Sequence, residues 1–310
     1  MRTNLSRNCI VTTLSIVAAD LTTGDLGIAV ASKFLACGAV VPWASAGAGA
    51  VATQSFANTA YGPDGIRMMR DGLSAREALT KLLADDADRD LRQVGLVDAR
   101  GGAAAHTGLG CHAWAGHHVG DGLACQGNIL VGQDTVDAMA AAFRASKGEL
   151  SGRLVTALAA GETAGGDKRG KQASAVYVVR PKGGYGGMND VLVDLRVDDH
   201  PKPIGELRRL LDLRNLYFGT SPAAEKLKIE GAVLADLKRV MISQGFYRGD
   251  VSASWDEAIE TALDAFIASE NFEERVDLKA RTIDAPVLAH LRANLMRVPS
   301  SQESTTTARS

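Results

Sequence analysis

The sequence predicts an α+β protein in which helix pairs cover antiparallel sheets. Three observations support this fold class. The expected elements follow the order strands, two helices, strands, two helices, strands. Turn-like stretches such as Thr22–Asp25 and Ala99–Gly101 join neighbouring apolar runs into hairpins, and single strands do not alternate with single helices. The pattern disfavours a doubly wound parallel sheet and favours a layered sandwich of antiparallel sheets.

The first half of the chain begins with a predicted hairpin. Thr12–Ala19 and Leu26–Ser32 are apolar runs that pair around Gly24. Ser74 is expected to cap a helix, because Glu77 completes the spacing of a capping box. The further elements expected here are strands Ala39–Val41 and Gly47–Thr53, helices Pro63–Met69 and Ala75–Leu83, and a second hairpin of Gln93–Asp98 with Ala103–Thr107.

The second half repeats this alternation and then changes in character. Apolar residues recur at helical spacing in Asp134–Ala145 and Gly152–Ala160, which predicts two amphipathic helices. The remaining expected elements are strands Leu123–Asn128, Ala173–Arg180 and Val191–Val197, and a helix Ile204–Tyr217. The chain becomes helical and charged after about Gly219, so we place a domain boundary near Phe218–Ala224. The predicted organisation is an N-terminal extension (1–11), a sandwich (12–219), a small helical domain (225–298) and a disordered tail (299–310).

Charge and composition narrow the classes of partner. The 34 basic and 36 acidic residues almost cancel, so we expect no nucleic-acid partner. We expect no membrane partner, because no apolar run approaches the roughly 20 residues of a membrane span. Four scattered cysteines without CxxC spacing fit reduced thiols in a cytoplasmic protein. Arg2 and Arg7 before the apolar run imitate a signal peptide, which is the alternative interpretation of the N-terminus.

A resemblance to a known family covers about two-thirds of the chain. Ordered segments such as "TGDLGIAVASKF", "VVPWASAGAGAVATQ", "CQGNIL", "GGDKRGKQ" and "VDLRVDDHPKP" resemble the bacterial domain-of-unknown-function family 1028. The resemblance implies the fold of the N-terminal-nucleophile hydrolases, a four-layer α/β/β/α sandwich. Beyond Glu225, the stretch "LADLKRVMISQGFYRGDVSASWDEAIETALDAFIASENFEERV" resembles a small helical peptidoglycan-binding-like domain.

The same resemblance implies a nucleophile at the start of the first strand. The segment Thr13–Val17 matches a Thr-x-Ser-Ile-Val segment, so Thr13 is the candidate nucleophile and its own α-amine the base. Because twelve residues precede Thr13, this mechanism needs their removal. A start at Val11 would instead expose Thr12 first, so both threonines remain candidates. The alternative is that both hydroxyls belong to ordinary strand residues.

Other polar residues near strand ends complete the candidate site. Gln126 and Asn128 place two amides around a glycine, and such groups can donate hydrogen bonds to a developing oxyanion. Ser32 and Lys33 end the second predicted strand and are further catalytic candidates. Lys33 is expected either to tune the pKa of the nucleophile or to be a surface lysine. The candidate substrate-binding residues are Gln54, Asn58, His117 and Asn189.

We expect no metal and no cofactor. Four histidines gather between residues 106 and 118, but none shows the i, i+4 spacing of a helix-borne zinc site. Catalysis by Cys111 or Cys125 is an alternative that the sequence does not favour.

Three function hypotheses follow. The first is a hydrolase of a small amide or cyclic amide that uses the N-terminal-nucleophile mechanism. The second is a non-catalytic binding or regulatory module on the same fold. The third is a cell-wall-associated protein whose last domain binds glycan or peptide. The stretch Val40–Trp43, expected to be exposed, also predicts a homodimer.

Overall fold

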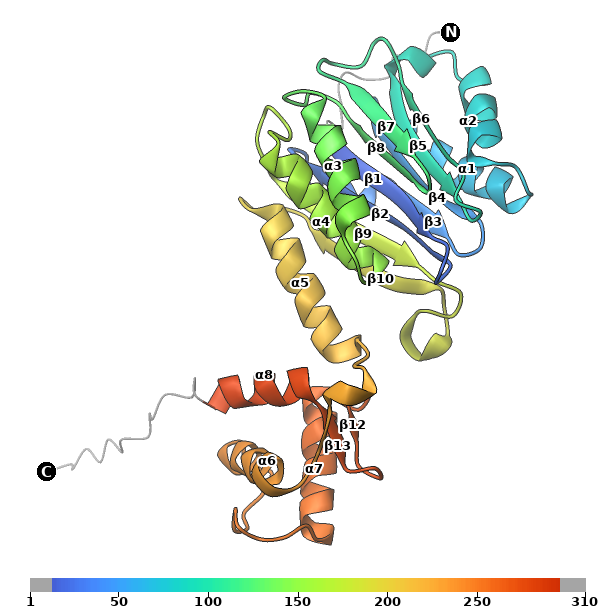
Figure 1. Ribbon diagram of the computed structural model, residues 1–310. Helices are drawn as coiled ribbons and strands as arrows, with labels where there is room; N and C mark the ends of the chain where they lie inside the picture. The colour runs from blue at the N-terminus through green and yellow to red at the C-terminus, as the bar shows by residue number, and fades with distance from the viewer. Residues whose placement is uncertain (1–12, 296–310) are drawn as a thin grey trace, which may run out of the picture. The chain divides into compact units, whose positions relative to one another are not determined.

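The structure is a computed structural model that describes residues 13–295 (Figure 1). Contacts divide the chain into two units, Met1–Leu211 and Asp212–Ser310, and the division falls within helix α5 (Pro203–Phe218). The boundary predicted from the sequence, near Phe218–Ala224, lies later in the chain. The physical reason for the difference is that Leu216 and Tyr217, near the end of α5, pack on the core of the second unit. The predicted extension 1–11 and tail 299–310 lie outside the described residues.

The first unit contains a six-stranded antiparallel sheet in the order β10-β9-β2-β1-β8-β7. The predicted first hairpin is confirmed, because β1 and β2 pair along their whole length from Thr13 opposite Ser32 to Asp20 opposite Asp25. Strand β7 was not predicted. The strands of this sheet are β1 (Thr13–Asp20), β2 (Asp25–Ser32), β7 (Gly116–Gly120), β8 (Leu123–Gly127), β9 (Ala173–Val179) and β10 (Val191–Val197).

A four-stranded antiparallel sheet faces the first, in the order β3-β4-β5-β6. Its strands are β3 (Pro42–Ser45), β4 (Gly49–Ser55), β5 (Arg92–Asp98) and β6 (Ala103–Thr107). The predicted strand Ala39–Val41 is wrong. Ala36 has a φ of 50°, which starts the 3-10 turn η1 (Cys37–Ala39) in its place. Val41 is fully buried, so it does not belong to the exposed patch that the sequence predicted for dimerisation.

Two helix pairs cover the outer faces of the two sheets (Figure 1). Helices α1 (Tyr61–Arg70) and α2 (Ala75–Ala84) pack on the four-stranded sheet, and α3 (Asp134–Ala145) and α4 (Leu150–Thr163) pack on the six-stranded sheet. The predicted capping box is confirmed, because the Ser74 hydroxyl accepts a hydrogen bond from Glu77 N and the Glu77 carboxylate accepts one from Ser74 N. Short 3-10 turns occupy Arg89–Leu91 (η2), Tyr185–Gly187 (η3) and Ala223–Glu225 (η4).

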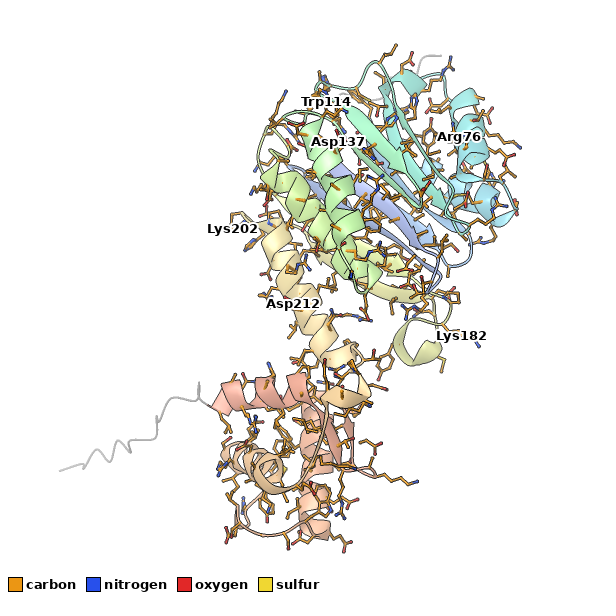
Figure 2. The ribbon with its side chains drawn as sticks, in the orientation of Figure 1. Arg76, Trp114, Asp137, Lys182, Lys202 and Asp212 are labelled. Carbon is orange, nitrogen blue, oxygen red and sulfur yellow. The ribbon has the colours of Figure 1, made fainter. Side chains whose placement is uncertain are left out.

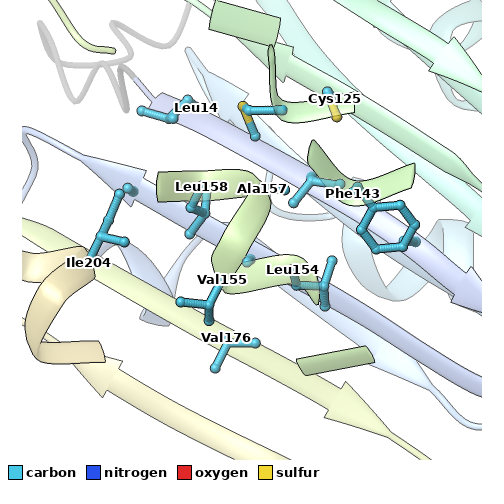
Figure 3. Packing of buried hydrophobic residues seen from close by; sticks show 14 of the residues in the cluster. Leu14, Cys125, Phe143, Leu154, Val155, Ala157, Leu158, Val176 and Ile204 are labelled. Carbon is cyan, nitrogen blue, oxygen red and sulfur yellow. The ribbon is translucent and has the colours of Figure 1, made fainter. Parts of the chain in front are cut away.

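The alternation of side chains along β1 divides the core of this unit in two. Leu14 and Ile16 point toward α3 and α4, where they join the apolar cluster drawn in Figure 3. Val17 points the other way, into the apolar layer between the two sheets. Since side chains alternate with a period of two, Thr13 and Ser15 face the same inter-sheet layer as Val17. The hydroxyls of the first strand therefore lie between the sheets.

The second unit combines three helices with a small sheet. Helices α6 (Gly231–Ser243), α7 (Glu257–Glu270) and α8 (Ala285–Leu295) enclose an apolar core around Leu237 and Phe266. The sheet has the order β11-β13-β12, with strands Lys226–Lys228, Thr282–Asp284 and Val276–Asp277. The predicted small helical domain therefore also contains a small sheet, which was not predicted because strands of two or three residues carry too short a pattern to recognise. Across residues 13–295, no helix is both long and apolar enough to span a membrane.

Candidate functional site

The candidate nucleophile lies at one end of the facing sheets. Thr13 is buried, and its hydroxyl donates a hydrogen bond of 3.4 Å to the Ser32 hydroxyl on the neighbouring strand. The Thr13 carbonyl accepts hydrogen bonds from the backbone N–H of Asn128 (3.1 Å) and from the Gln54 side chain (3.4 Å). The structure thus brings four of the sequence-predicted residues together. The alternative nucleophile Thr12 lies outside the described residues.

Five fully buried polar side chains next to Thr13 form what we call the inter-sheet network: Ser15, Gln54, Gln93, Gln126 and Asn128. The Ser15 hydroxyl donates to Gln54 Oε1 at 2.6 Å and accepts from Gln126 Nε2 at 2.7 Å. Ser15 and Gln126 belong to the six-stranded sheet and Gln54 to the four-stranded sheet, so these bonds cross the space between the sheets.

Gln93 at the start of β5 is the centre of this network and was not among the residues predicted from the sequence. Its Oε1 accepts hydrogen bonds from Gln54 Nε2 (2.8 Å) and Asn128 Nδ2 (2.9 Å). Its Nε2 donates to the carbonyl of Gly127 (2.7 Å) and lies 3.0 Å from the Thr107 hydroxyl. Gln93 therefore joins both sheets through one amide. The sequence does contain a signal for Gln93: it is a glutamine near the end of an apolar strand, as Gln54 and Gln126 are.

The two predicted oxyanion donors already have protein partners. The Gln126 amide N–H donates to Ser15 and the Asn128 amide N–H to Gln93. Their oxygens, Gln126 Oε1 and Asn128 Oδ1, have no hydrogen-bond partner among residues 13–295. Gln126 packs directly over Gly95, where a Cβ would lie 2.1 Å from Oε1. The two side-chain atoms without a partner here, Gln126 Oε1 and Asn128 Oδ1, are therefore hydrogen-bond acceptors and not donors.

Lys33 and His117 lie at the edge of the same end of the sheets. Lys33 is exposed, and its backbone N–H donates to the buried carboxylate of Asp167 at 3.2 Å. Asp167 also forms an ion pair of 2.8 Å with Arg169, so it fixes the chain at the end of β2. His117 is exposed, and its Nδ1 lies 2.9 Å from the Thr107 hydroxyl that contacts Gln93. Asp167 was not selected from the sequence, although it follows two glycines in "GGDKRGKQ".

Asn58 belongs to a different polar cluster. Its amide donates to Asp86 at 3.1 Å, and Arg92 and Tyr61 donate to the same carboxylate at 2.9 Å each. Burial raises the pKa of Asp86, but the hydrogen bonds from Arg92, Asn58 and their neighbours outweigh it and lower the pKa below its ordinary value. We call this the Asp86 cluster.

Asn189 lies at the opposite end of the six-stranded sheet from Thr13. It follows β9, whose first residue Ala173 pairs with Ser32, and its side chain accepts a hydrogen bond from Val191 N at 2.9 Å. Figure 2 labels Lys182 in the same loop, far along the sheets from Trp114 at the other end. The expectation that Asn189 shares a site with Thr13 is therefore wrong.

Three free cysteines, Cys37, Cys111 and Cys125, lie among the described residues. Burial raises the pKa of the Cys37 thiol to about 12, and burial also raises the pKa of Cys125. Such thiols do not ionise readily and are poor nucleophiles. Between residues 13 and 295, no three His, Cys, Asp or Glu side chains come close enough to hold a metal ion.

The second unit carries an open cavity of about 630 Å³, which we call the C-terminal pocket. Its wall includes the start of α6, the loop at Val251–Trp255 and the turn before β13. The Arg281 guanidinium lies 4.7 Å from the centre of the Trp255 ring. The polar and aromatic residues of its wall include Lys228, Glu230, Trp255 and Arg281. The sequence did not predict a binding role for Trp255, which lies in the stretch that resembles the peptidoglycan-binding-like domain.

These features define a class of protein: an α+β unit of two facing antiparallel sheets with covering helices, followed by a unit of helices and a small sheet. Residues 13–207 match the family described as "Family of unknown function (DUF1028)", and residues 218–291 match the family described as "Putative peptidoglycan binding domain". The chain belongs to the DUF1028 family.

A solved structure supports this membership. The crystal structure of the DUF1028 protein SPO2555 from Silicibacter pomeroyi is 32% identical in sequence and superposes with a TM-score of 0.60. The match covers 69% of this chain and 92% of that protein. No curated protein matches the chain.

Proposed function

We propose that the second unit binds cell-wall peptidoglycan and thereby holds the protein at the cell wall. The observation that carries this proposal is the C-terminal pocket, all of whose lining residues fall within the stretch that matches the peptidoglycan-binding family. Its volume of about 630 Å³ is in the range of small-ligand sites. On this proposal the protein works at the cell wall, and the cytoplasmic location expected from the cysteines stays an untested alternative.

Co-sedimentation with purified insoluble peptidoglycan tests the proposal. The full chain should pellet with it. Trp255→Ala should lower the affinity at least about tenfold, because the substitution removes an aromatic ring from the pocket wall. Tyr185→Ala is the matched control, since it removes an 84% exposed aromatic side chain from the other unit. Circular dichroism checks that both variants stay folded. A native chain that remains in the supernatant would contradict the proposal.

A second candidate function is hydrolysis of a small amide or cyclic amide by Thr13. The observation that favours it is the position of Thr13 at the first residue of β1, beside Ser32 and the inter-sheet network. The finer fold assignment, a four-layer sandwich of the N-terminal-nucleophile hydrolase type, is part of this proposal. The competing reading is a non-catalytic module, and it gains from the fact that both predicted oxyanion donors are already hydrogen-bonded.

Two measurements decide between the hydrolase and the non-catalytic module: the mass of the mature protein, which gives its N-terminus, and its activity on a panel of substrates. An intact mass that begins at Thr12 or Thr13 should accompany turnover of an amide, a lactam or a ureido compound. Thr13→Ala should then abolish turnover and Thr13→Ser retain part of it, while Thr59→Ala, an exposed threonine, keeps the full rate. Full activity of Thr13→Ala would exclude this mechanism. The predicted homodimer stays a prediction that light scattering can check.

A further inference from the structure

The wall of the C-terminal pocket carries more positive than negative charge. Two exposed basic side chains, Lys228 and Arg281, line it, and Glu230 is the one carboxylate among its lining residues. Arg281 is held over the Trp255 ring, so its guanidinium is restrained before any ligand arrives. Helix α6 begins at Gly231 in the same wall, and no side chain caps its first turn. A helix N-terminus favours a negative charge beside it.

A buried lysine beneath the pocket wall adds to its positive electrostatic potential. Lys238 on α6 is fully buried, and its ammonium donates hydrogen bonds to the carbonyls of Val251 (3.3 Å) and Ala253. Both carbonyls belong to residues of the pocket wall. Hydrogen bonds from Ser252 lower the pKa of Asp250, and an electrostatic interaction of this carboxylate with Lys238 adds to that shift. Water screens a buried charge less than an exposed one, so the Lys238 ammonium contributes positive potential beside the carbonyls of the pocket wall.

We propose that the C-terminal pocket binds a carboxylate from the peptide part of peptidoglycan, and not its neutral sugars. This inference rests on the proposed function, since it names the portion of the polymer that the same pocket takes. Arg281 is placed to pair with the carboxylate oxygens, and a guanidinium can do so through two parallel hydrogen bonds. Lys228 and the start of α6 supply further positive potential on the same wall.

Three forms of the ligand separate this inference from the proposed function. The first is intact insoluble peptidoglycan. The second is the same material after an amidase has removed the stem peptides and the lactyl carboxylates that this hydrolysis leaves on the glycan strands have been converted to amides. The third is a synthetic stem peptide, compared as the free acid and with every carboxylate converted to the amide. The full chain should bind the intact polymer and the free-acid peptide. Binding to the glycan strands should be lost, and the amidated peptide should bind at least about tenfold more weakly.

Variants that replace one arginine with an uncharged glutamine test which arginine contacts the carboxylate. Arg281→Gln should weaken binding of the free-acid peptide by roughly ten- to hundredfold, the range for a hydrogen bond to a charged group. Arg239→Gln is the matched control, because Arg239 is an exposed arginine of the same unit that pairs with Asp236 and does not line the pocket. Both variants should melt at nearly the same temperature as the native protein.

The outcomes are distinguishable. If glycan strands bind as well as the intact polymer and amidation leaves peptide affinity unchanged, the carboxylate inference is wrong and the proposed function stands. Equal peptide affinity of Arg281→Gln and Arg239→Gln would also overturn it. If neither the polymer nor the peptide binds, the proposed function fails and this inference fails with it.

Discussion

The inter-sheet network and the C-terminal pocket differ in whether their polar groups are buried or exposed. The inter-sheet network is fully buried, and its amides and hydroxyl bond to one another and to the backbone. Near Thr13, on the face of the six-stranded sheet that α4 covers, the cavity lined by Ser32 and Asp167 has only about 50 Å³. The C-terminal pocket is more than ten times larger and leaves Lys228 and Arg281 exposed.

This difference separates a polar core from a binding surface. A space of about 50 Å³ accommodates water, whereas small-ligand sites usually measure about 300 Å³ or more. Residues of the inter-sheet network should therefore matter first for stability, and residues of the C-terminal pocket for ligand binding. The following substitutions test that contrast, from the largest expected effect to the smallest.

Gln93→Leu should be the most destabilising change. Leucine fills a similar volume but leaves Gln54, Asn128 and the Gly127 carbonyl without their buried partner. Each unsatisfied buried group costs about 1–3 kcal/mol, so we expect a loss of about 4 kcal/mol in the free energy of unfolding. Urea denaturation followed by circular dichroism measures it.

The control for this change is Gln133→Leu, an exposed glutamine of the same unit, which should alter stability by less than about 0.5 kcal/mol. Equal stability of the two variants would mean that the inter-sheet network does not support the fold.

Gly95→Ala should cost about 1–3 kcal/mol, because the added methyl group meets Gln126 Oε1 at 2.1 Å. A double-mutant cycle sharpens the interpretation: in the Gln126→Ala background, where the amide is absent, most of this cost should disappear. Gly152→Ala is the control, since a Cβ there meets no atom within 4 Å and alanine favours the helix. Additive effects of the two substitutions would show that the amide is not the obstacle.

The smallest expected effect is a change in how much stability the protein loses at acidic pH. The side chains of the inter-sheet network do not titrate, whereas the pKa of Asp86 is lowered in the folded chain. A lowered folded-state pKa stabilises the fold above the ordinary value of 3.8, and this stabilisation is lost as the pH falls below that value. Denaturation at pH 7, 4 and 3 should show a smaller acid-induced loss for Asp86→Asn than for the native chain. Asp64→Asn, an exposed control on α1, should retain the native loss. Identical profiles for all three proteins would show that Asp86 is not a source of the acid sensitivity.

Much of the fold could be predicted because long apolar runs and turn residues mark its elements. The hairpin β1–β2 and the capping box at Ser74 are examples. Strand β7, with the sequence GHHVG, was missed because Val119 is its one large apolar residue. The error at Ala39–Val41 arose from the positive φ of Ala36, a conformation that the residue type does not signal.

The candidate site could be predicted only in part. Gln126 and Asn128 were recognisable as amides in an apolar strand and Gln54 as a candidate substrate-binding residue, and the structure joins them. Sequence alone does not show which end of a sheet a loop occupies, so Asn189 was grouped with residues at the other end. Trp255 and Arg281 come together only through the tertiary fold, and no local pattern marks their contact.

The burial of Ser15 opposite Gln126 has a consequence for how the strands align during folding. These residues are direct partners across β1 and β8. A shift of either strand by one position would turn its polar side chain toward the leucines beneath α4 and break the bonds to Gln54 or Ser15 at the same time. Misaligned pairings of these apolar, alanine-rich strands are thereby penalised, and the uncharged polar residues help to select one native alignment.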